Sequence, residues 1–229
     1  MKQLSNSDIN IILITSAALT TLRSNILATT STAPAIGQKY KLTDGLLLNR
    51  IVEWNGEAFN SANKAALTIS NNHPSVPNLY AARRDSDNAT DVTQAVMASV
   101  TIPGFLLGST SKLTIVPFWN TDNVNTGLAN TKNTVVQLFT TGNGAGVFSA
   151  VPLSGSTTVT RQFLECMNSS LTSQLALNNQ SSYGSAQGVL RHSYDFKTDV
   201  DIRFICYWSA ICPTASFIEL LGYSIELMP

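Results

Sequence analysis

The segment 199–210, D-V-D-I-R-F-I-C-Y-W-S-A, alternates apolar and polar side chains with a period of two. One side of an extended chain there carries Val200, Ile202, Phe204, Cys206 and Trp208. This pattern predicts a β-strand with one buried face. The segment 219–227 repeats it, with an expected inner face of Leu221, Tyr223, Ile225 and Leu227 and an outer face of Gly222, Ser224 and Glu226. We therefore expect the chain to end in a sheet.

Further strand candidates precede these two at short intervals, separated by turns rich in Gly, Asn, Ser and Pro. The eight candidates are 95–102, 113–119, 134–140, 147–153, 158–166, 189–192, 200–209 and 217–227. Because no helical pattern lies between them, they predict an antiparallel β-sandwich, and eight strands is the number found in a jelly roll.

The start of the chain has a different pattern. Apolar residues at Ile11, Ile14, Ala18 and Leu22 follow a helical spacing, which predicts a short helix over 7–22 capped by Ser7. The β-branched residues within it keep a strand as the alternative. The composition of 29–35, T-T-S-T-A-P-A, is that of a linker.

A small β-hairpin module is expected next. Strands are predicted at 40–42 and 50–54, with a turn at Asp44-Gly45 and a strong hairpin signal at Asn55-Gly56. The periodicity then fades, and 60–91 is expected to form connecting loops. The predicted domains are therefore an N-terminal segment over 1–33, the small module over 34–91 and a jelly-roll-like β-sandwich over 92–229.

Few residues carry charge. The 14 basic and 14 acidic residues balance, and charged residues make up 12% of the chain, about half the usual share. Ser, Thr and Asn together supply almost a third of the 229 residues. The neutral balance argues against a nucleic-acid binder, because neutralising phosphates requires an excess of Lys and Arg. A surface of hydroxyls and amides suits a subunit that is buried in an assembly, because such groups cost less to desolvate than charges.

The three cysteines, Cys166, Cys206 and Cys212, provide neither a disulfide framework nor close zinc-ligand spacing. Cys206 lies on the apolar face of its strand, which predicts a packed thiol, and we expect a reduced, intracellularly folded protein. A signal peptide is the other interpretation of the N-terminal residues, but Asp8 and Asn10 interrupt its lead-in and no A-x-A cleavage site follows. No run of 18 apolar residues predicts a membrane span.

Candidate catalytic chemistry is sparse. The two histidines, His73 and His192, lie near no motif serine or cysteine, and no hydrolase, zinc-protease or P-loop pattern occurs. A Ser–His–carboxylate triad assembled from distant strands is left open, because such triads are spatial. A glycosidase pair is a second alternative, with candidate carboxylates at Asp195, Asp199, Asp201 and Glu219. We expect no enzyme, no catalytic residue and no cofactor.

Three loop motifs have simple structural interpretations. Asp85, Asp87, Asn88 and Asp91 gather oxygen ligands that calcium could use, but the glycine and glutamate of an EF-hand are missing, so a solvated loop and no metal site are expected. The glycines of 142–146 predict a hairpin turn, because no helix follows to form a phosphate site. The pair Arg83-Arg84 is too short for an electrostatic patch.

Aromatic residues are expected mainly in the core, with Phe204, Trp208 and Tyr223 as its central members. Sugar stacking at strand ends is the alternative, and it makes loops 120–125 and 178–183 candidates for contact with host glycans. For attachment to a partner, the candidates are Leu13, Leu19 and Trp54.

Two parts of the chain resemble virion appendage proteins of tailed bacteriophages. The first contains Pro34, Gly37, Tyr40, Leu42 and Asp44-Gly45, continued by R-I-V-E-W-N-G at 50–56 and Phe59, and resembles a small β module of phage fibre proteins. The second contains A-S-V-T-I-P-G at 98–104, Leu106-Leu107-Gly108, Leu113 to Asn123 and L-L-G-Y-S-I-E-L at 220–227, and resembles the β-sandwich of phage head, neck or tail fibre subunits.

This resemblance covers about two thirds of the chain and involves turns and strand ends, so it supplies no catalytic residue. It implies a homotrimer whose N-terminal part docks on other virion proteins and whose β domain lies outermost. We therefore expect a structural virion protein, a short fibre, tip or decoration subunit, assembled in the host cytoplasm without nucleic-acid binding or membrane insertion. Host-glycan recognition is the alternative, and cleavage of surface polysaccharide is a third.

Overall fold

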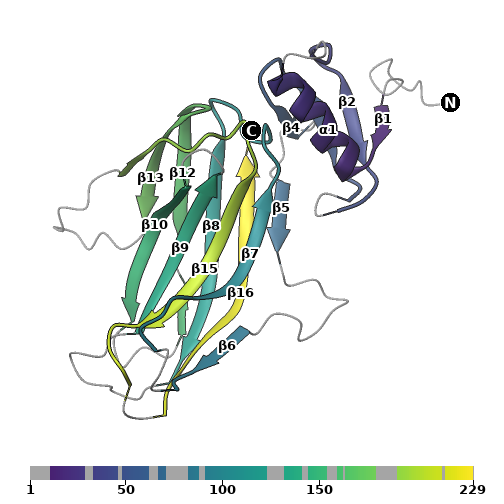
Figure 1. Ribbon diagram of the computed structural model, residues 1–229. Coiled ribbons are helices and arrows are strands. Elements are labelled where there is room, and N and C mark those ends of the chain that lie inside the picture. Colours follow the sequence, from purple (N-terminus) through teal and green to yellow (C-terminus); the bar gives the residue numbers. More distant parts are fainter. Residues whose placement is uncertain are drawn as a thin grey trace.

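Strands dominate the computed structural model, which has one helix and sixteen strands in the residues it describes. These residues are 11–28, 33–45, 48–61, 67–70, 82–87, 91–122, 132–140, 144–153, 159–161, 163–178, 190–212 and 215–228. The helix and the first four strands form an N-terminal module at one end of the molecule, and the other twelve strands form an elongated β-sandwich (Figure 1). The predicted mainly β fold class with a C-terminal antiparallel sandwich is confirmed.

The N-terminal module is a four-stranded sheet with a helix against it. Its strand order is β1 (Ile11–Ile14), β2 (Lys39–Leu42), β3 (Ile51–Trp54) and β4 (Phe59–Ser61), with β1 and β2 parallel and the other pairs antiparallel. Helix α1 (Ser16–Leu27) connects the parallel pair. The core of the module consists of Leu19, Tyr40, Leu42, Val52, Trp54 and Phe59. Among the described residues no helix is long and apolar enough to span a membrane.

The predicted helix over 7–22 is wrong in its placement. Residues Ile11–Ile14 form strand β1, which was the alternative, and the helix begins only at Ser16. Thr15 is the N-cap, because its hydroxyl accepts a hydrogen bond of 3.1 Å from the amide of Ala18. The expected cap, Ser7, lies outside the described residues. Residues 11–14 are therefore a strand and not the first turns of a helix, because they pair with β2 and because Thr15 caps the helix after them.

The predicted hairpin at Asn55-Gly56 is confirmed between β3 and β4. The Asn55 side-chain oxygen accepts hydrogen bonds from the amides of Glu57 (2.9 Å) and Ala58 (2.7 Å), which stabilises the turn. Gly56 has a φ of +98°, a conformation that side-chain-bearing residues avoid.

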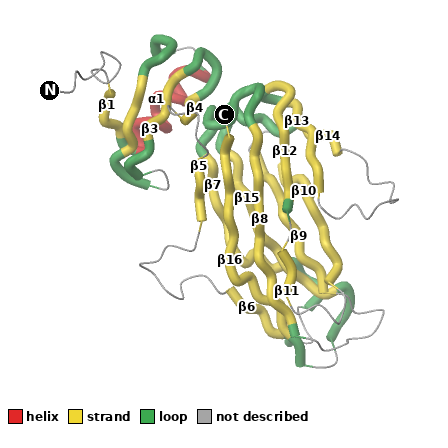
Figure 2. The backbone as a smooth tube through the Cα atoms, turned by 180° about the vertical axis from the view of Figure 1, so that it is seen from behind, coloured by secondary structure: helices red, strands yellow, loops and turns green. Residues whose placement is uncertain are grey.

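The β-sandwich consists of two antiparallel sheets, seen from behind in Figure 2. The first has the order β10 (Gly144–Leu153), β9 (Lys132–Thr140), β15 (Val200–Trp208), β7 (Ala95–Ile102). The second has the order β14 (Leu190–His192), β13 (Ser173–Asn178), β12 (Leu164–Ser170), β8 (Lys112–Thr121), β16 (Phe217–Met228), β5 (Leu67–Ser70). In addition, β11 (Val159–Arg161) pairs with β8, and β6 (Ala82–Asp85) pairs with β16.

The core lies between the two sheets. All five residues expected on the inner face of β15 are buried, as are Trp119 and Ile115 of β8. The rings of Phe204 and Tyr223 stack across the sheets with centroids 4.7 Å apart, so these predicted core residues meet directly. Cys166, Cys206 and Cys212 are buried free thiols, as was expected for Cys206. Burial raises the pKa of Cys166 to about 12 and of Cys206 to about 11.

The expected inner face of the last strand is wrong at its first member. Leu221 is 42% exposed, whereas Gly222 is buried. The pairing of β16 with β8 shifts register between Leu220 and Gly222, so a β-bulge reverses the alternation at this point. Ile218 and Leu220 are buried before the bulge, and Tyr223, Ile225 and Leu227 are buried after it.

The number of strands was underestimated. The segment 60–91, expected to form loops, contains β5 and β6, and both pair with β16 of the sandwich and not with the small module. The candidate 158–166 divides into β11 and β12, and β13 was not predicted. Residues 62–66, 71–81 and 88–90 of the expected loops lie outside the described residues. The sandwich therefore has twelve described strands where eight were expected.

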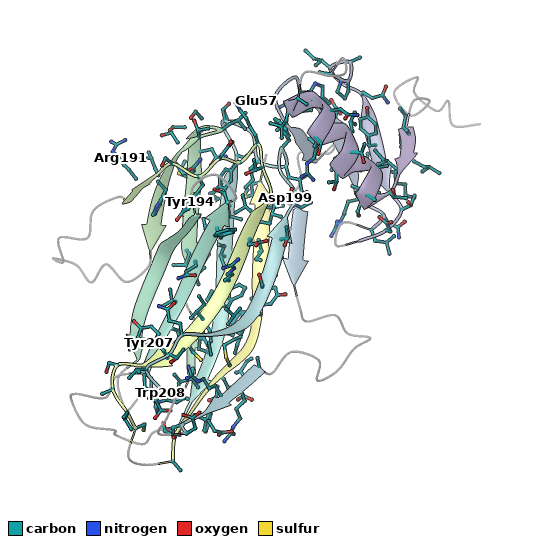
Figure 3. The ribbon with its side chains drawn as sticks, viewed as in Figure 1. Glu57, Arg191, Tyr194, Asp199, Tyr207 and Trp208 are labelled. Atoms are coloured by element: carbon teal, nitrogen blue, oxygen red, sulfur yellow. The ribbon has the colours of Figure 1, made fainter. Side chains whose placement is uncertain are left out.

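The module and the sandwich contact each other through specific polar and aromatic pairs. The buried Arg23 of α1 forms an ion pair with Asp199, whose carboxylate also accepts a 2.9 Å hydrogen bond from the amide of Gly104. Glu57 accepts hydrogen bonds from the amide and the hydroxyl of Ser109, at 3.0 and 2.8 Å. Figure 3 shows Glu57 of the module and Asp199 of the sandwich at the junction between the two parts. These contacts hold the two parts together.

Candidate functional site

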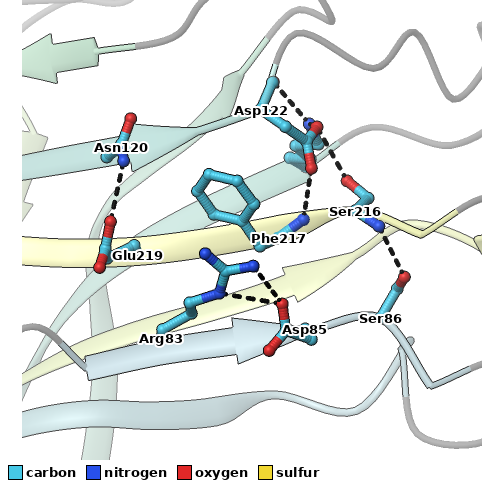
Figure 4. A network of polar contacts seen from close by, with 9 residues as sticks. Arg83, Asp85, Ser86, Asn120, Asp122, Ser216, Phe217 and Glu219 are labelled. Carbon is cyan, nitrogen blue, oxygen red and sulfur yellow. Dashed lines mark hydrogen bonds and ion pairs between the residues drawn. The ribbon is translucent and has the colours of Figure 1, made fainter.

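A polar pocket lies at the end of the sandwich opposite the N-terminal module, where β6 meets the start of β16 and the end of β8 (Figures 1 and 4). Its volume is about 140 Å³. It is lined by Arg83, Asp85, Ser86, Asp122, Ala215, Ser216 and Phe217. These residues come from segments far apart in the sequence, so the pocket is a product of strand pairing.

Strand register places the polar side chains of this region on the outer face of the sheet. Glu219 of β16 pairs directly with Arg83 of β6 on one side and with Asn120 of β8 on the other. Residues at alternating positions, such as Ile218 and Trp119, point into the core and are fully buried. A guanidinium, a carboxylate and an amide therefore stand in a row across three strands, and the Asn120 amide donates a 2.8 Å hydrogen bond to Glu219.

Asp122 anchors the inner wall of the pocket. Its carboxylate contacts the Lys132 ammonium group and accepts hydrogen bonds from the amide of Phe217 (2.6 Å) and the hydroxyl of Ser216 (3.1 Å). Burial alone would raise the pKa of Asp122, but these hydrogen bonds and the positive charge of Lys132 together lower it. Lys132 is 1% exposed, so its charge is balanced almost entirely by this carboxylate.

Arg83 forms the outer wall of the pocket. Its guanidinium donates hydrogen bonds of 2.9 and 2.7 Å to the Asp85 carboxylate and lies 4.0 Å from the centroid of the Phe217 ring. The hydrogen bond to Asp85 is the main reason that the pKa of Arg83 is raised. About half of the Arg83 side chain and two thirds of the Asp85 side chain are exposed, so both are accessible from solvent.

The lining of the pocket is mainly polar. It offers hydrogen-bond donors, acceptors and one aromatic ring, whereas its lining includes no histidine and no cysteine. The described part of the chain contains no cluster of three or more His, Cys, Asp or Glu residues that could hold a metal ion. His192 lies elsewhere, on β14, where its ring stacks on Tyr194 at 5.0 Å and burial lowers its pKa. His73 lies outside the described residues.

The four carboxylates considered for a glycosidase pair are bound in separate interactions. Asp199 pairs with Arg23 at the junction with the module, and Asp201 accepts a 2.6 Å hydrogen bond from Thr101. Asp195 accepts a 3.0 Å hydrogen bond from the amide of Lys197 within a turn, and only Glu219 belongs to the polar row beside the pocket.

The calcium alternative places its oxygen ligands in one loop, but Asp91 has a structural role. This residue is fully buried, and its carboxylate accepts hydrogen bonds from the amides of Asp87 (2.9 Å) and Cys212 (2.8 Å). Asp85 instead pairs with Arg83 at the pocket, and Asn88 lies outside the described residues. The prediction of a solvated loop is thus wrong for Asp91, whose carboxylate links the backbone at Asp87 to the backbone at Cys212.

Other candidate residues are placed as follows. Of the expected hairpin turn over 142–146, residues 144–146 belong to strand β10, which pairs antiparallel with β9, and 142–143 lie outside the described residues. Of the proposed sugar-binding loops, Asn120 lies beside the pocket, whereas 123–130 and 179–189 lie outside the described residues. Of the three attachment candidates, Leu19 and Trp54 are buried in the module core, and Leu13 is 68% exposed on β1.

Sequence reasoning missed the pocket because its residues were assigned to a loop and to unrelated strands. Arg83 and Asp85 alternate with Ala82 and Arg84, a pattern of period two over four residues. Arg84 points the other way, where its guanidinium donates a 2.6 Å hydrogen bond to the carbonyl of Thr93 and lies 5.2 Å from the Trp208 ring. That alternation was the available signal for a short edge strand.

No protein-family model matches the chain, and no curated protein matches its sequence. Among solved structures, the VP2 subviral particle of infectious bursal disease virus matches with a TM-score of 0.34 and 10% identity, over 81% of this chain and 36% of VP2. The CBM2 module of the evolved Dit protein of Lactobacillus casei phage J-1 matches with a TM-score of 0.31 and 12% identity, over 56% and 67% of the two chains. The basic lectin of winged bean, solved with Tn-antigen, matches with a TM-score of 0.30 and 8% identity, over 72% and 100%.

The chain thus spans about a third of the length of the VP2 protein that it matches. All three similarities combine low identity with low TM-scores, so none assigns a family or a function. The assignment of the fold as a β-sandwich rests on the strand pairing of the structure itself.

Proposed function

We propose that the protein is a non-enzymatic structural subunit of a tailed-bacteriophage virion, a homotrimer attached to the particle by its N-terminal module. The observation that carries the attachment is strand β1, which lies at the edge of its sheet and leaves Ile12 48% and Leu13 68% exposed. An edge strand with apolar side chains is a surface that proteins normally cover by pairing or burial.

Three further exposed apolar residues support this role of the module: Leu27, Ile36 and Leu48. Charged residues, which oppose association by electrostatic repulsion, make up only 12% of the chain. The low charge and the high content of Ser, Thr and Asn suit a subunit with neighbours on several sides. Under this proposal the protein assembles with other virion proteins in the host cytoplasm and resides in the virion.

The test is quantitative mass spectrometry of virions purified from a phage that encodes the chain. We expect the wild-type chain in the particles, in a copy number that is a multiple of three. The variant Leu13→Lys should be lost from them, because burying an unpaired lysine at an interface is costly. Val96→Lys is the matched control, since Val96 is a similarly exposed apolar residue (56%) on the sandwich.

Two results would contradict parts of the proposal separately. Absence of the wild-type chain from virions would refute the virion role, and normal incorporation of Leu13→Lys would refute attachment through β1. Light scattering of the purified chain at micromolar concentration tests the trimer, and a monomer there would contradict it.

Glycan recognition is the second candidate function. The specific observation that favours it is the polar pocket, which lies at the opposite end of the sandwich from the proposed attachment surface. A subunit attached by one end presents the other to its surroundings, where host glycans are found.

A further inference from the structure

We infer that the pocket between Arg83, Asp122 and Phe217 binds one neutral pyranose unit of a glycan. This inference deepens the second candidate function and does not depend on the virion role. It rests on the shape of the pocket, its charge balance and the arrangement of its polar groups.

The pocket suits a small polyhydroxylated ligand in size. Its volume of about 140 Å³ holds roughly five water molecules at about 30 Å³ each. A sugar ring can replace such a group of waters while offering hydroxyls in their place. Phe217 supplies an aromatic ring within this polar lining; the Arg83 guanidinium lies 4.0 Å from its centroid and covers one face, so the C–H groups of a sugar ring would pack against the part that Arg83 leaves uncovered.

The charges around the pocket favour a neutral ligand. Arg83 is balanced by Asp85, and Lys132 is balanced by Asp122. Glu219, at the flank, adds one negative charge, so an anionic ligand meets no excess of positive charge. A cation would have to compete with hydrogen bonds and ion pairs that the carboxylates of Asp85 and Asp122 already form.

The polar groups are arranged in the way that adjacent hydroxyls require. Each sugar hydroxyl donates one hydrogen bond and accepts others, so a vicinal pair is best met by neighbouring donors and acceptors. Within the lining, Arg83 presents donors, Asp85 presents an acceptor, and the hydroxyls of Ser86 and Ser216 can do both. Outside the lining, Glu219 and Asn120 continue this polar row over two adjacent strands. Adjacent strands lie about 4.8 Å apart, a spacing that one sugar ring can span.

Saturation-transfer NMR on the purified full chain tests the inference, with millimolar methyl glycosides of glucose, galactose, mannose and N-acetylglucosamine as probes. A single sugar in so small a pocket should bind with a dissociation constant on the order of millimolar. We expect at least one of the four to receive saturation, and the methyl glycoside of N-acetylneuraminic acid, which is anionic, to receive none. An oligosaccharide of the responding sugar, compared with its methyl glycoside, tells a glycan chain from a free sugar as the ligand.

Arg83→Ala is the decisive variant, because Arg83 is half exposed and its loss leaves the buried pair Asp122 and Lys132 intact. We expect its affinity for the responding sugar to fall about tenfold, as when a charged hydrogen bond is lost. Arg203→Ala is the matched control: Arg203 also lies over a phenylalanine, Phe139 at 4.5 Å, and also pairs with an aspartate, but it does not line the pocket.

Three results would overturn the inference: no response from any of the four neutral probes, a response from the anionic probe alone, or equal affinity of the Arg83→Ala and wild-type chains. Equal weakening by Arg203→Ala would also overturn it, because the binding would then lie elsewhere. Circular dichroism of each variant verifies that the fold is kept. If Arg83→Ala does not fold, Asp85→Ala, which also changes an exposed residue of the lining, replaces it under the same criteria.

Discussion

The pair of Lys132 and Asp122 offers a sharp test of how the pocket end of the sandwich is stabilised. The Lys132 ammonium group, on a side chain that is 1% exposed, contacts the Asp122 carboxylate and donates a 2.9 Å hydrogen bond to the main-chain carbonyl of the same residue. The Asp122 side chain is 14% exposed and also accepts hydrogen bonds from Phe217 and Ser216. Removing one member of the pair should therefore have a very different effect from removing the other.

Asp122→Ala leaves a buried ammonium group and two donors without their carboxylate. Breaking a buried ion pair in this way costs about 3–5 kcal/mol, and the slight exposure of Asp122 places the expected loss at the lower end, about 3 kcal/mol. Lys132→Met removes the buried charge and keeps most of the apolar stem, while Asp122 retains two donors, so the expected loss is about 1 kcal/mol. The double variant should lose less than Asp122→Ala alone, with a coupling of about 2 kcal/mol.

Urea unfolding of the full chain measures these free energies of unfolding. Trp119 and Trp208 report on the sandwich by fluorescence, and an unchanged m-value shows that each variant unfolds in the same way. The pKa of Asp122 is lowered in the folded state, so its contribution is present above the unfolded value near 3.8 and is lost as pH falls through the folded value. The difference between wild type and Asp122→Ala should therefore shrink in strong acid. A Lys132→Met loss equal to that of Asp122→Ala, or strict additivity, would refute the reasoning.

Two further predictions concern backbone packing and a buried histidine. Gly104→Ala should lower the melting temperature by several degrees, because a Cβ there would lie 2.3 Å from the carbonyl oxygen of Lys197. Gly108→Ala is the control: the nearest atom to its Cβ would lie at 3.4 Å, so it should have little effect. Equal shifts of the melting temperature in the two variants would contradict this prediction. Burial lowers the pKa of His192, so the unfolded chain takes up a proton first and stability should fall as pH drops below about 6.5. In His192→Phe, which keeps a ring beside Tyr194, that part of the decrease should vanish in thermal melts across pH 5 to 8.

The sandwich was predictable where one strand has one continuous buried face. The alternation in 200–208 identified all five inner residues of β15, because that face packs against the other sheet along its whole length. The hairpin at Asn55-Gly56 was predictable for a local reason, since turn geometry depends on the residues of the turn itself.

The errors arose where pairing with distant segments decided the outcome. Leu221 is exposed because a bulge against β8 reverses the alternation, and the isolated glycine at 222 was the one local signal of that bulge. Strands β5 and β6 have four residues each and obtain their hydrogen bonds from β16, more than a hundred residues later in the chain. Short edge strands of this kind are too brief for periodicity to reveal.

The pocket could not be predicted either, because its residues come together only through the pairing of distant segments. This construction also affects how a ligand would bind. Of the pocket's lining, Arg83, Asp85 and Phe217 stand on paired strands, so the ladder hydrogen bonds fix their positions, whereas Ser86, Asp122, Ala215 and Ser216 lie just beyond the strand ends. A ligand that contacts the three strand residues need not order their backbone, which leaves more of its contact energy for affinity. The same construction divides the residues by role: Asp122 and Lys132 join strands within the fold, so replacing them disturbs stability and binding together. Arg83 lies at the exposed rim, and its replacement is the change that separates recognition from folding.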